Sequence, residues 1–153
     1  MKKEIHLKWF YPYSVDTIWD YLTDADLLKQ WSTIHRDEPF QAEPGFQWTS
    51  TQKARRGWDG IMYLEVLEVV PKKKLAYALK GGPRPGELSL DTVVTYKLIE
   101  KEGGTELQLS HTGFQGLKGA FTAFIMEKGW GKFFGKRLAT VLNETHHDAH
   151  TIR

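Results

Sequence analysis

The chain has 153 residues, of which 41% are hydrophobic and 26% charged, with a net charge of +2 and no cysteine. This balance argues against disorder and predicts one globular domain over residues 1–153. The lack of cysteine excludes disulfides, thiolate catalysis and cysteine-ligated zinc. Aromatic residues form 13% of the chain and include six tryptophans, so large rings are expected either to fill the core or to line a cavity in it.

Nothing in the sequence is typical of a membrane-spanning or nucleic-acid-binding protein. The opening residues up to Tyr13 lack the apolar stretch of a signal peptide, and no later run approaches the ~18 apolar residues of a membrane span. Lysines 72–74 follow Pro71 where a hairpin turn is expected, and a solvated turn explains them better than a phosphate-binding patch. We therefore expect a cytoplasmic protein with no membrane span and no nucleic-acid partner.

The first part of the chain predicts a strand and two short helices. Apolar side chains alternate along residues 3–11, which is typical of a half-buried strand, and Pro12 ends it. Ser14 can cap a first helix and Asp24 a second, because their side-chain oxygens can accept hydrogen bonds from free N–H groups of the first turn. The apolar faces of these helices would carry Val15, Ile18, Trp19, Leu22, Leu27, Leu28 and Trp31.

From about residue 37 to residue 113 the pattern changes to short apolar stretches separated by turns. No helix-length insertion lies between them, so they are expected to form an antiparallel meander. The turn signals are at 43–45, 57–60, 71–74, 81–86 and 103–104, and the strands between them include residues 46–48, 61–70, 75–79, 94–98 and 105–111.

The last third predicts one long amphipathic helix. Ala120, Phe121, Phe124 and Ile125 share a face, and similar spacing continues from Trp130 to residue 142. Glycines 129 and 131 each cost a helix roughly 1 kcal/mol relative to alanine, so they indicate a break, a kink or a close approach of another backbone. One helix can bury one face of a sheet only if the sheet curls around it, and such curling often leaves space for a ligand.

Several motifs follow one another in an order that resembles a known family. They are Trp19, Trp31, Pro44-Gly45, Gly60, the run 66–71, Leu75-x-Tyr77, Gly104-Thr105, the run 111–114 and Gly129-Trp130. Over nearly the whole chain the sequence resembles homologues of the C-terminal domain of the activator of heat-shock-protein-ninety ATPase, in the Bet v-like, START-like (SRPBCC) superfamily.

The resemblance implies an α+β helix-grip fold, in which a curved antiparallel sheet wraps around a long C-terminal helix and encloses a hydrophobic cavity. It does not fix the activity, because the superfamily includes lipid carriers, hormone receptors, cyclases and oxygenase domains. The eukaryotic co-chaperone also carries a separate N-terminal domain, for which 153 residues leave no room.

His111 is the leading candidate for chemistry. It shares the apolar strand face with Leu107 and Leu109, where a neutral imidazole could contact a ligand or act as acid or base. A structural histidine bonded to backbone or to a hydroxyl is the favoured alternative, because catalysis needs a second positioned group and none is evident. His6 and His35 are assigned no role.

Neither a metal site nor a pair of catalytic carboxylates is convincing. His146 and His150 are four apart, but the segment lacks an HExxH motif, so a solvated tail is favoured and no metal or cofactor is expected. Glu65 and Glu68 are three apart in a predicted strand, so they should face opposite sides of the sheet.

The expected ligand-binding residues are aromatic side chains together with one methionine and His111. They would favour a flat or branched apolar ligand, with His111 and two tyrosine hydroxyls as polar contacts, unless the rings fill the cavity themselves. The set is Trp31, Trp48, Trp58, Met62, Tyr77, Tyr96, His111, Phe121, Phe124 and Trp130.

The leading functional hypothesis is therefore non-enzymatic capture of a small hydrophobic molecule. One alternative is a cyclase, dehydratase or hydrolase that uses His111 with Tyr77 or Tyr96. Another is a co-chaperone-like module that binds a chaperone. A homodimer formed through exposed aromatic side chains also stays open.

Overall fold

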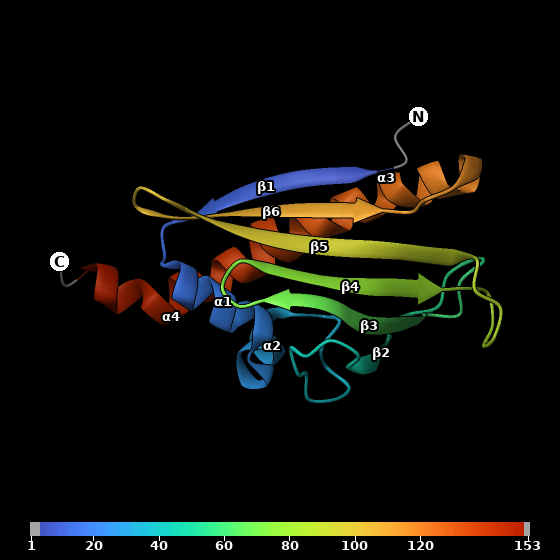
Figure 1. The fold of residues 1–153 in the computed structure, drawn as a ribbon, viewed down its shortest axis with the longest axis horizontal. Helices are drawn as coiled ribbons and strands as arrows, with labels where there is room; N and C mark the ends of the chain where they lie inside the picture. The colour runs from blue at the N-terminus through green and yellow to red at the C-terminus, as the bar shows by residue number, and fades with distance from the viewer. Residues whose placement is uncertain (1–3, 152–153) are drawn as a thin grey trace.

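A computed structural model describes residues 4–151, and the side chains of residues 4–146. In the described residues, six strands form one antiparallel sheet in the order β1-β6-β5-β4-β3-β2 (Figure 1). The strands are β1 (Ile5–Tyr11), β2 (Gln47–Thr51), β3 (Ile61–Val70), β4 (Lys74–Gly81), β5 (Leu90–Lys101) and β6 (Gly104–Thr112). The helices are α1 (Val15–Thr23), α2 (Ala25–Trp31), α3 (Gly116–Lys132), a π-helical segment η1 (Phe133–Leu138) and α4 (Ala139–Thr151).

This order confirms the expected α+β class. Strands β2 to β6 form the predicted meander, and β1 returns to pair with β6 at the edge of the sheet. Helices α1 and α2 follow β1, and the long C-terminal helix runs along the sheet (Figure 1). The register aligns the inward-facing residues Tyr77, Val94 and His111 of β4, β5 and β6 in one row across the sheet.

Both predicted helix caps are present. The Ser14 hydroxyl accepts a hydrogen bond from the Thr17 N–H at 3.2 Å. The Asp24 carboxylate accepts bonds from two N–H groups at the start of α2, each at 3.0 Å. These caps satisfy N–H groups that have no partner inside the helix, which explains why α1 and α2 begin where they do.

The C-terminal helix changes geometry at η1 rather than at its glycines. A Cβ added at Gly129 or Gly131 would meet nothing within 4 Å, and the helix continues through both, so neither a break nor a close backbone contact occurs there. The wider turn of η1 instead lets the consecutive residues Phe133 and Phe134 both lie in the core. Such π-helical insertions are often found at functional sites.

The predicted inward face of α3 needs correction. Phe121 and Phe124 point outward and are exposed, whereas Ala120, Ala123 and Trp130 are buried. The small inward residues let α3 approach its neighbours closely, and a Cβ at the buried Gly119 would meet Phe114 atoms at 3.0–3.4 Å. Apolar spacing alone does not distinguish the two faces of a helix that carries apolar residues on both.

A β-bulge also corrects one expectation about β3. The register with β4 shifts between Val66 and Glu68, because Leu67 is an extra residue in the ladder. Glu65 pairs with Ala78 and Glu68 with Ala76 on the other strand. Those two alanines lie on the same face, so Glu65 and Glu68 do as well, contrary to the simple alternation expected from their spacing.

Candidate functional site

Six of the predicted ligand-binding residues come together between the sheet and the C-terminal helix. They are Trp31 from α2, Trp48 from β2, Tyr77 from β4, Tyr96 from β5, His111 from β6 and Trp130 from α3. Their rings are buried and in contact, with Tyr77 centred 5.6 Å from Trp48 and 5.5 Å from Tyr96. Phe134 of η1 connects the network, with its centroid 5.2 Å from Tyr96 and 5.6 Å from Trp31.

His111 is fully buried and bonded at both ring nitrogens. The Trp130 Nε1–H donates to its Nδ1 at 3.0 Å, which makes Nδ1 an acceptor and leaves the proton on Nε2. The Nε2–H then donates to the Thr92 hydroxyl at 2.8 Å, and that hydroxyl donates to the Leu79 carbonyl at 2.8 Å. The three hydrogen bonds form one continuous chain, from Trp130 through His111 and Thr92 to the Leu79 carbonyl, in which each donor has an acceptor. We call this chain the His111 relay.

Burial lowers the pKa of His111 from its usual 6.5 to about 3, because the charged imidazolium would lose its hydration. The residue is thus neutral at physiological pH. Since neither nitrogen has a free position, His111 cannot take or give a proton without breaking the relay. The geometry matches the structural histidine that the sequence analysis favoured, and does not support a general acid or base.

Tyr77 and Tyr96 form the second buried polar group. Their hydroxyl oxygens lie 2.5 Å apart, so one hydroxyl donates to the other. Among the described residues neither hydroxyl has another hydrogen-bond partner, which leaves one O–H hydrogen of the pair without an acceptor. Burial raises the pKa of both tyrosines, so both hydroxyls stay protonated at neutral pH.

His35 belongs to this interior, although the sequence analysis assigned it no role. Its ring stacks on Trp48 at a centroid distance of 5.4 Å and meets Phe40 edge-on. Its Nδ1 lies 2.5 Å from the Ser32 hydroxyl, which also accepts the Ile34 N–H. The hydroxyl hydrogen has no other acceptor among the described residues, so it is donated to Nδ1 and the imidazole carries its proton on Nε2.

The Nε2–H of His35 has no partner among the described residues, and burial lowers the pKa of His35 to about 3, so it is a neutral donor. Periodicity could not find it, because it lies in the irregular segment between α2 and β2. The available signal was the Ser32-x-x-His35 spacing after the helix end, which suits a local bond between the two side chains.

The remaining predicted residues lie elsewhere. Met62 is partly buried and packs against the edge of the core. Trp58 precedes β3 in the β2–β3 loop and donates to the Ile61 carbonyl at 3.0 Å. Phe121 and Phe124 lie on the outer face of α3 and do not meet the interior cluster. Contact of these four residues with a ligand stays a prediction.

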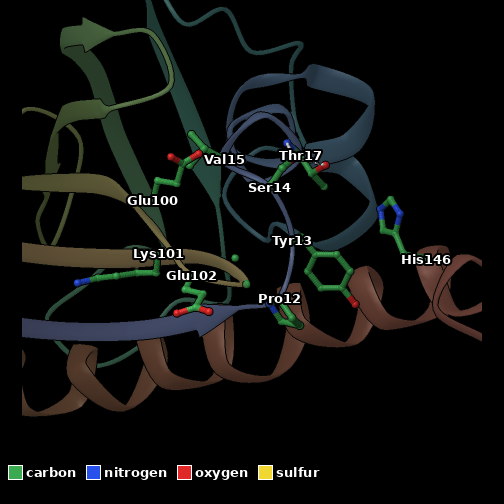
Figure 2. Close-up of a pocket in the computed structure, with 11 residues that line it drawn as sticks. Pro12, Tyr13, Ser14, Val15, Thr17, Glu100, Lys101, Glu102 and His146 are labelled. Carbon is green, nitrogen blue, oxygen red and sulfur yellow. Dashed lines mark hydrogen bonds between the residues drawn. The ribbon is translucent and has the colours of Figure 1, made fainter. Parts of the chain in front are cut away.

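Two surface depressions lie apart from the Tyr77–Tyr96 pair. One of about 670 Å³ lies between the β5–β6 turn and the start of α1, and Figure 2 shows Tyr13 and His146 among its residues. There the Tyr13 hydroxyl donates to Asn143 at 2.8 Å, and its ring lies 5.4 Å from that of His146. The other, of about 330 Å³, is lined mainly by outward-facing residues of β2, β3 and β4, and Trp48 of the ring cluster also contributes to its wall.

The described residues contain no group of three or more histidine, aspartate or glutamate side chains that could hold a metal ion. The histidine pair considered for a metal includes His150, which with His147 and Asp148 lies outside the residues whose side chains are described. Of the helices in the described part of the chain, none combines the length and apolar character needed to cross a membrane.

A curved antiparallel sheet, two short helices after its first strand and a long helix over a buried aromatic cluster define a helix-grip domain. Residues 12–143 match the family model described as Activator of Hsp90 ATPase homolog 1-like protein, and the chain therefore belongs to that family. This confirms the resemblance inferred from the sequence motifs. No curated protein sequence matches the chain.

Solved structures with the same fold include three that cover most of this chain. Protein MLL2253 from Mesorhizobium loti is 25% identical, with a TM-score of 0.77 over 93% of this chain and 98% of that one. DynU16, a putative protein in the dynemicin biosynthetic locus, is 22% identical with a TM-score of 0.72, over 94% of this chain but 48% of its own. CalU16 from Micromonospora echinospora is 19% identical with a TM-score of 0.70, over 91% of this chain and 73% of its own.

Proposed function

We propose that this protein binds a small, mainly apolar molecule that carries a hydrogen-bond acceptor, between the sheet and the C-terminal helix. The observation that carries the proposal is the buried Tyr77–Tyr96 pair, which has two hydroxyl hydrogens and one hydrogen bond. A buried donor without an acceptor costs about 1–3 kcal/mol, so a ligand carbonyl, ether or hydroxyl at this position would remove an existing penalty.

The surroundings of the pair determine the kind of ligand. Trp48, Trp130 and Phe134 lie around the two tyrosines and offer flat apolar surfaces. They favour an aromatic or polycyclic molecule, and burial of about 200 Å² of its apolar surface would contribute roughly 5 kcal/mol before the costs of association.

Ligand entry requires movement, because the interior rings are in contact with one another. The rings of Phe133 and Phe134 are best placed to move, since they lie on the π-helical segment and make no side-chain hydrogen bond, whereas Trp130 is held by its bond to His111. A catalytic function gains no comparable support, because His111 has both nitrogens engaged.

The test combines native mass spectrometry of the purified protein with a thermal-shift screen of aromatic and polycyclic compounds. For a bound compound, Tyr77→Phe/Tyr96→Phe should weaken affinity about tenfold, the loss of one buried hydrogen bond. The control Tyr63→Phe removes a hydroxyl from the outer face of β3 and should leave the affinity unchanged. A compound that binds the double variant as tightly as the wild type would contradict the proposed contact.

A further inference from the structure

The segment of residues 32–46 connects α2 to β2 without regular secondary structure (Figure 1). Among the described residues, backbone-to-backbone hydrogen bonds join it to the sheet only at its end. There the Gly45 N–H donates to the Val66 carbonyl and the Val66 N–H donates to the Phe46 carbonyl, each at 2.8 Å. A segment with so few backbone hydrogen bonds belongs to the parts of a protein that open locally at the lowest cost.

Two carboxylates fasten the middle of this segment to the free edge of β2. Glu38 accepts the Thr49 N–H and Asp37 accepts the Thr51 N–H, each at 2.9 Å. Because β2 is an edge strand, these are N–H groups that a further strand would otherwise take. Two side chains thus replace a neighbouring strand, with two bonds in place of a ladder.

The same segment packs two rings on Trp48. The His35 ring stacks on Trp48 at a centroid distance of 5.4 Å, and the Phe40 ring meets it edge-on at 4.9 Å. Trp48 in turn lies 5.6 Å from Tyr77, a member of the hydroxyl pair that lacks an acceptor. Trp48 therefore connects the segment to the tyrosine pair.

The other walls of the ring cluster are held more firmly. Backbone ladders join β3 to β6, and α3 is tied to the sheet by the bond from Trp130 to His111. Phe133 and Phe134, the rings best placed to move, meet the cluster at Trp31, which directly precedes the segment. An opening of the segment would thus lie next to these rings.

From these observations we infer that residues 32–46 form a lid. The lid opens locally when Asp37 and Glu38 leave the edge of β2, and it uncovers Trp48 as the route by which a ligand reaches the tyrosine pair. The route rests on the proposed function, whereas the opening itself depends on no ligand.

Thiol labelling of the full chain measures the opening, because the chain has no cysteine of its own. Ser50→Cys places a thiol at a buried position beside the lid, where the Ser50 hydroxyl donates to the Thr33 carbonyl at 3.5 Å. The control Val94→Cys places a thiol at a buried position within β5. Iodoacetamide should label Ser50→Cys faster than Val94→Cys by about tenfold or more, at a rate that low urea concentrations barely change.

Two further variants separate lid opening from global unfolding. Asp37→Ala/Glu38→Ala removes the bonds to β2 and should accelerate labelling of Ser50→Cys about tenfold. Tyr11→Phe removes a bond between β1 and the π-helical segment that stays intact when only the lid is open. It should therefore accelerate labelling of Val94→Cys about tenfold and leave that of Ser50→Cys unchanged. Labelling of Ser50→Cys that Tyr11→Phe accelerates, or that rises with urea as steeply as that of Val94→Cys, would overturn the inference.

Amide hydrogen exchange of the unmodified chain decides the same question if Ser50→Cys does not fold. The Thr49 and Thr51 N–H groups bond only to the lid carboxylates, so they should exchange ahead of the amides within the β4–β5 ladder. Exchange of both groups at the rate of the ladder amides would contradict a local opening.

The route is tested with fluorenone, a flat tricyclic ketone, whose association is followed by stopped-flow quenching of tryptophan fluorescence. Only binding that Tyr77→Phe/Tyr96→Phe weakens is counted, which leaves out attachment to surface patches. Asp37→Ala/Glu38→Ala should raise the association rate about tenfold, in step with the labelling. An unchanged association rate beside faster labelling would exclude this route. Absence of any fluorenone binding would instead count against the proposed function, because the thiol and amide rates decide the lid without a ligand.

Discussion

The hydrogen-bond relay at His111 makes a specific prediction about Thr92. Valine has the shape of threonine but no hydroxyl, so Thr92→Val leaves the His111 Nε2–H buried without a partner, whereas the Leu79 carbonyl keeps its place in the β4–β5 ladder. A buried unpartnered donor costs about 1–3 kcal/mol, and the added methyl group returns at most about 1 kcal/mol. We therefore expect a loss of about 1–2 kcal/mol in the free energy of unfolding, a measurable part of the 5–15 kcal/mol typical of a domain.

Urea unfolding at pH 7, followed by tryptophan fluorescence and circular dichroism, measures this loss. The matched control is Thr122→Val, because the Thr122 hydroxyl donates to the Lys118 carbonyl on the exposed surface of α3 and its removal should cost less than about 0.5 kcal/mol. The nitrogen NMR shifts of His111 should report a proton on Nε2 in the wild type. A Thr92→Val loss no larger than that of Thr122→Val, or a proton on Nδ1, would refute the direction assigned to the relay.

Three further predictions concern the histidines, the helical glycines and a buried tyrosine. His35 and His111 have folded pKa values of about 3 and an unfolded value near 6.5, so below pH 6.5 the unfolded chain binds more protons than the folded chain. The free energy of unfolding should therefore decrease as the pH is lowered from 6.5 to about 3. His111→Gln removes one of the two groups, so its unfolding equilibrium constant should depend less steeply on pH than that of the wild type, by a factor of up to about ten per pH unit. Gly129→Ala and Gly131→Ala should each stabilise the protein by about 0.5–1 kcal/mol in urea unfolding, since an added Cβ meets nothing; destabilisation would mean that the glycines serve a bend. Tyr11→Phe removes a 2.7 Å bond to a backbone carbonyl of the π-helical segment and should lower the melting temperature, at a cost of about 1–2 kcal/mol.

The elements that the sequence predicted well are those determined by neighbouring residues. Ser14 and Asp24 cap their helices with groups two or three residues away, and the alternation of residues 5–11 matches the burial of β1. His111 was placed on the buried strand face by the same alternation. In each case the pattern and its physical cause lie within one element, so they can be read without knowledge of the fold.

The features that the sequence could not predict depend on contacts between distant elements. The outward direction of Phe121 follows from the close fit of small α3 residues against the fold, and the bulge at Leu67 appears only when β3 is aligned with β4. The π-helical geometry of η1 is favoured because Phe134 and its neighbour both reach Trp31, which lies about a hundred residues earlier. Local spacing contains no information about such partners.

The His111 relay and the Tyr77–Tyr96 pair differ in a way that matters for function. At His111 every donor has an acceptor, so the relay stabilises one arrangement of β4, β5, β6 and α3 and gains nothing from a ligand. At Tyr77 and Tyr96 one hydroxyl donor lacks an acceptor, so without a ligand the folded protein carries the free-energy cost of that buried, unpartnered donor. The sequence analysis made His111 the leading candidate for chemistry, but in the structure the hydrogen bonds of His111 stabilise the fold. A ligand could instead add a missing hydrogen bond at the Tyr77–Tyr96 pair.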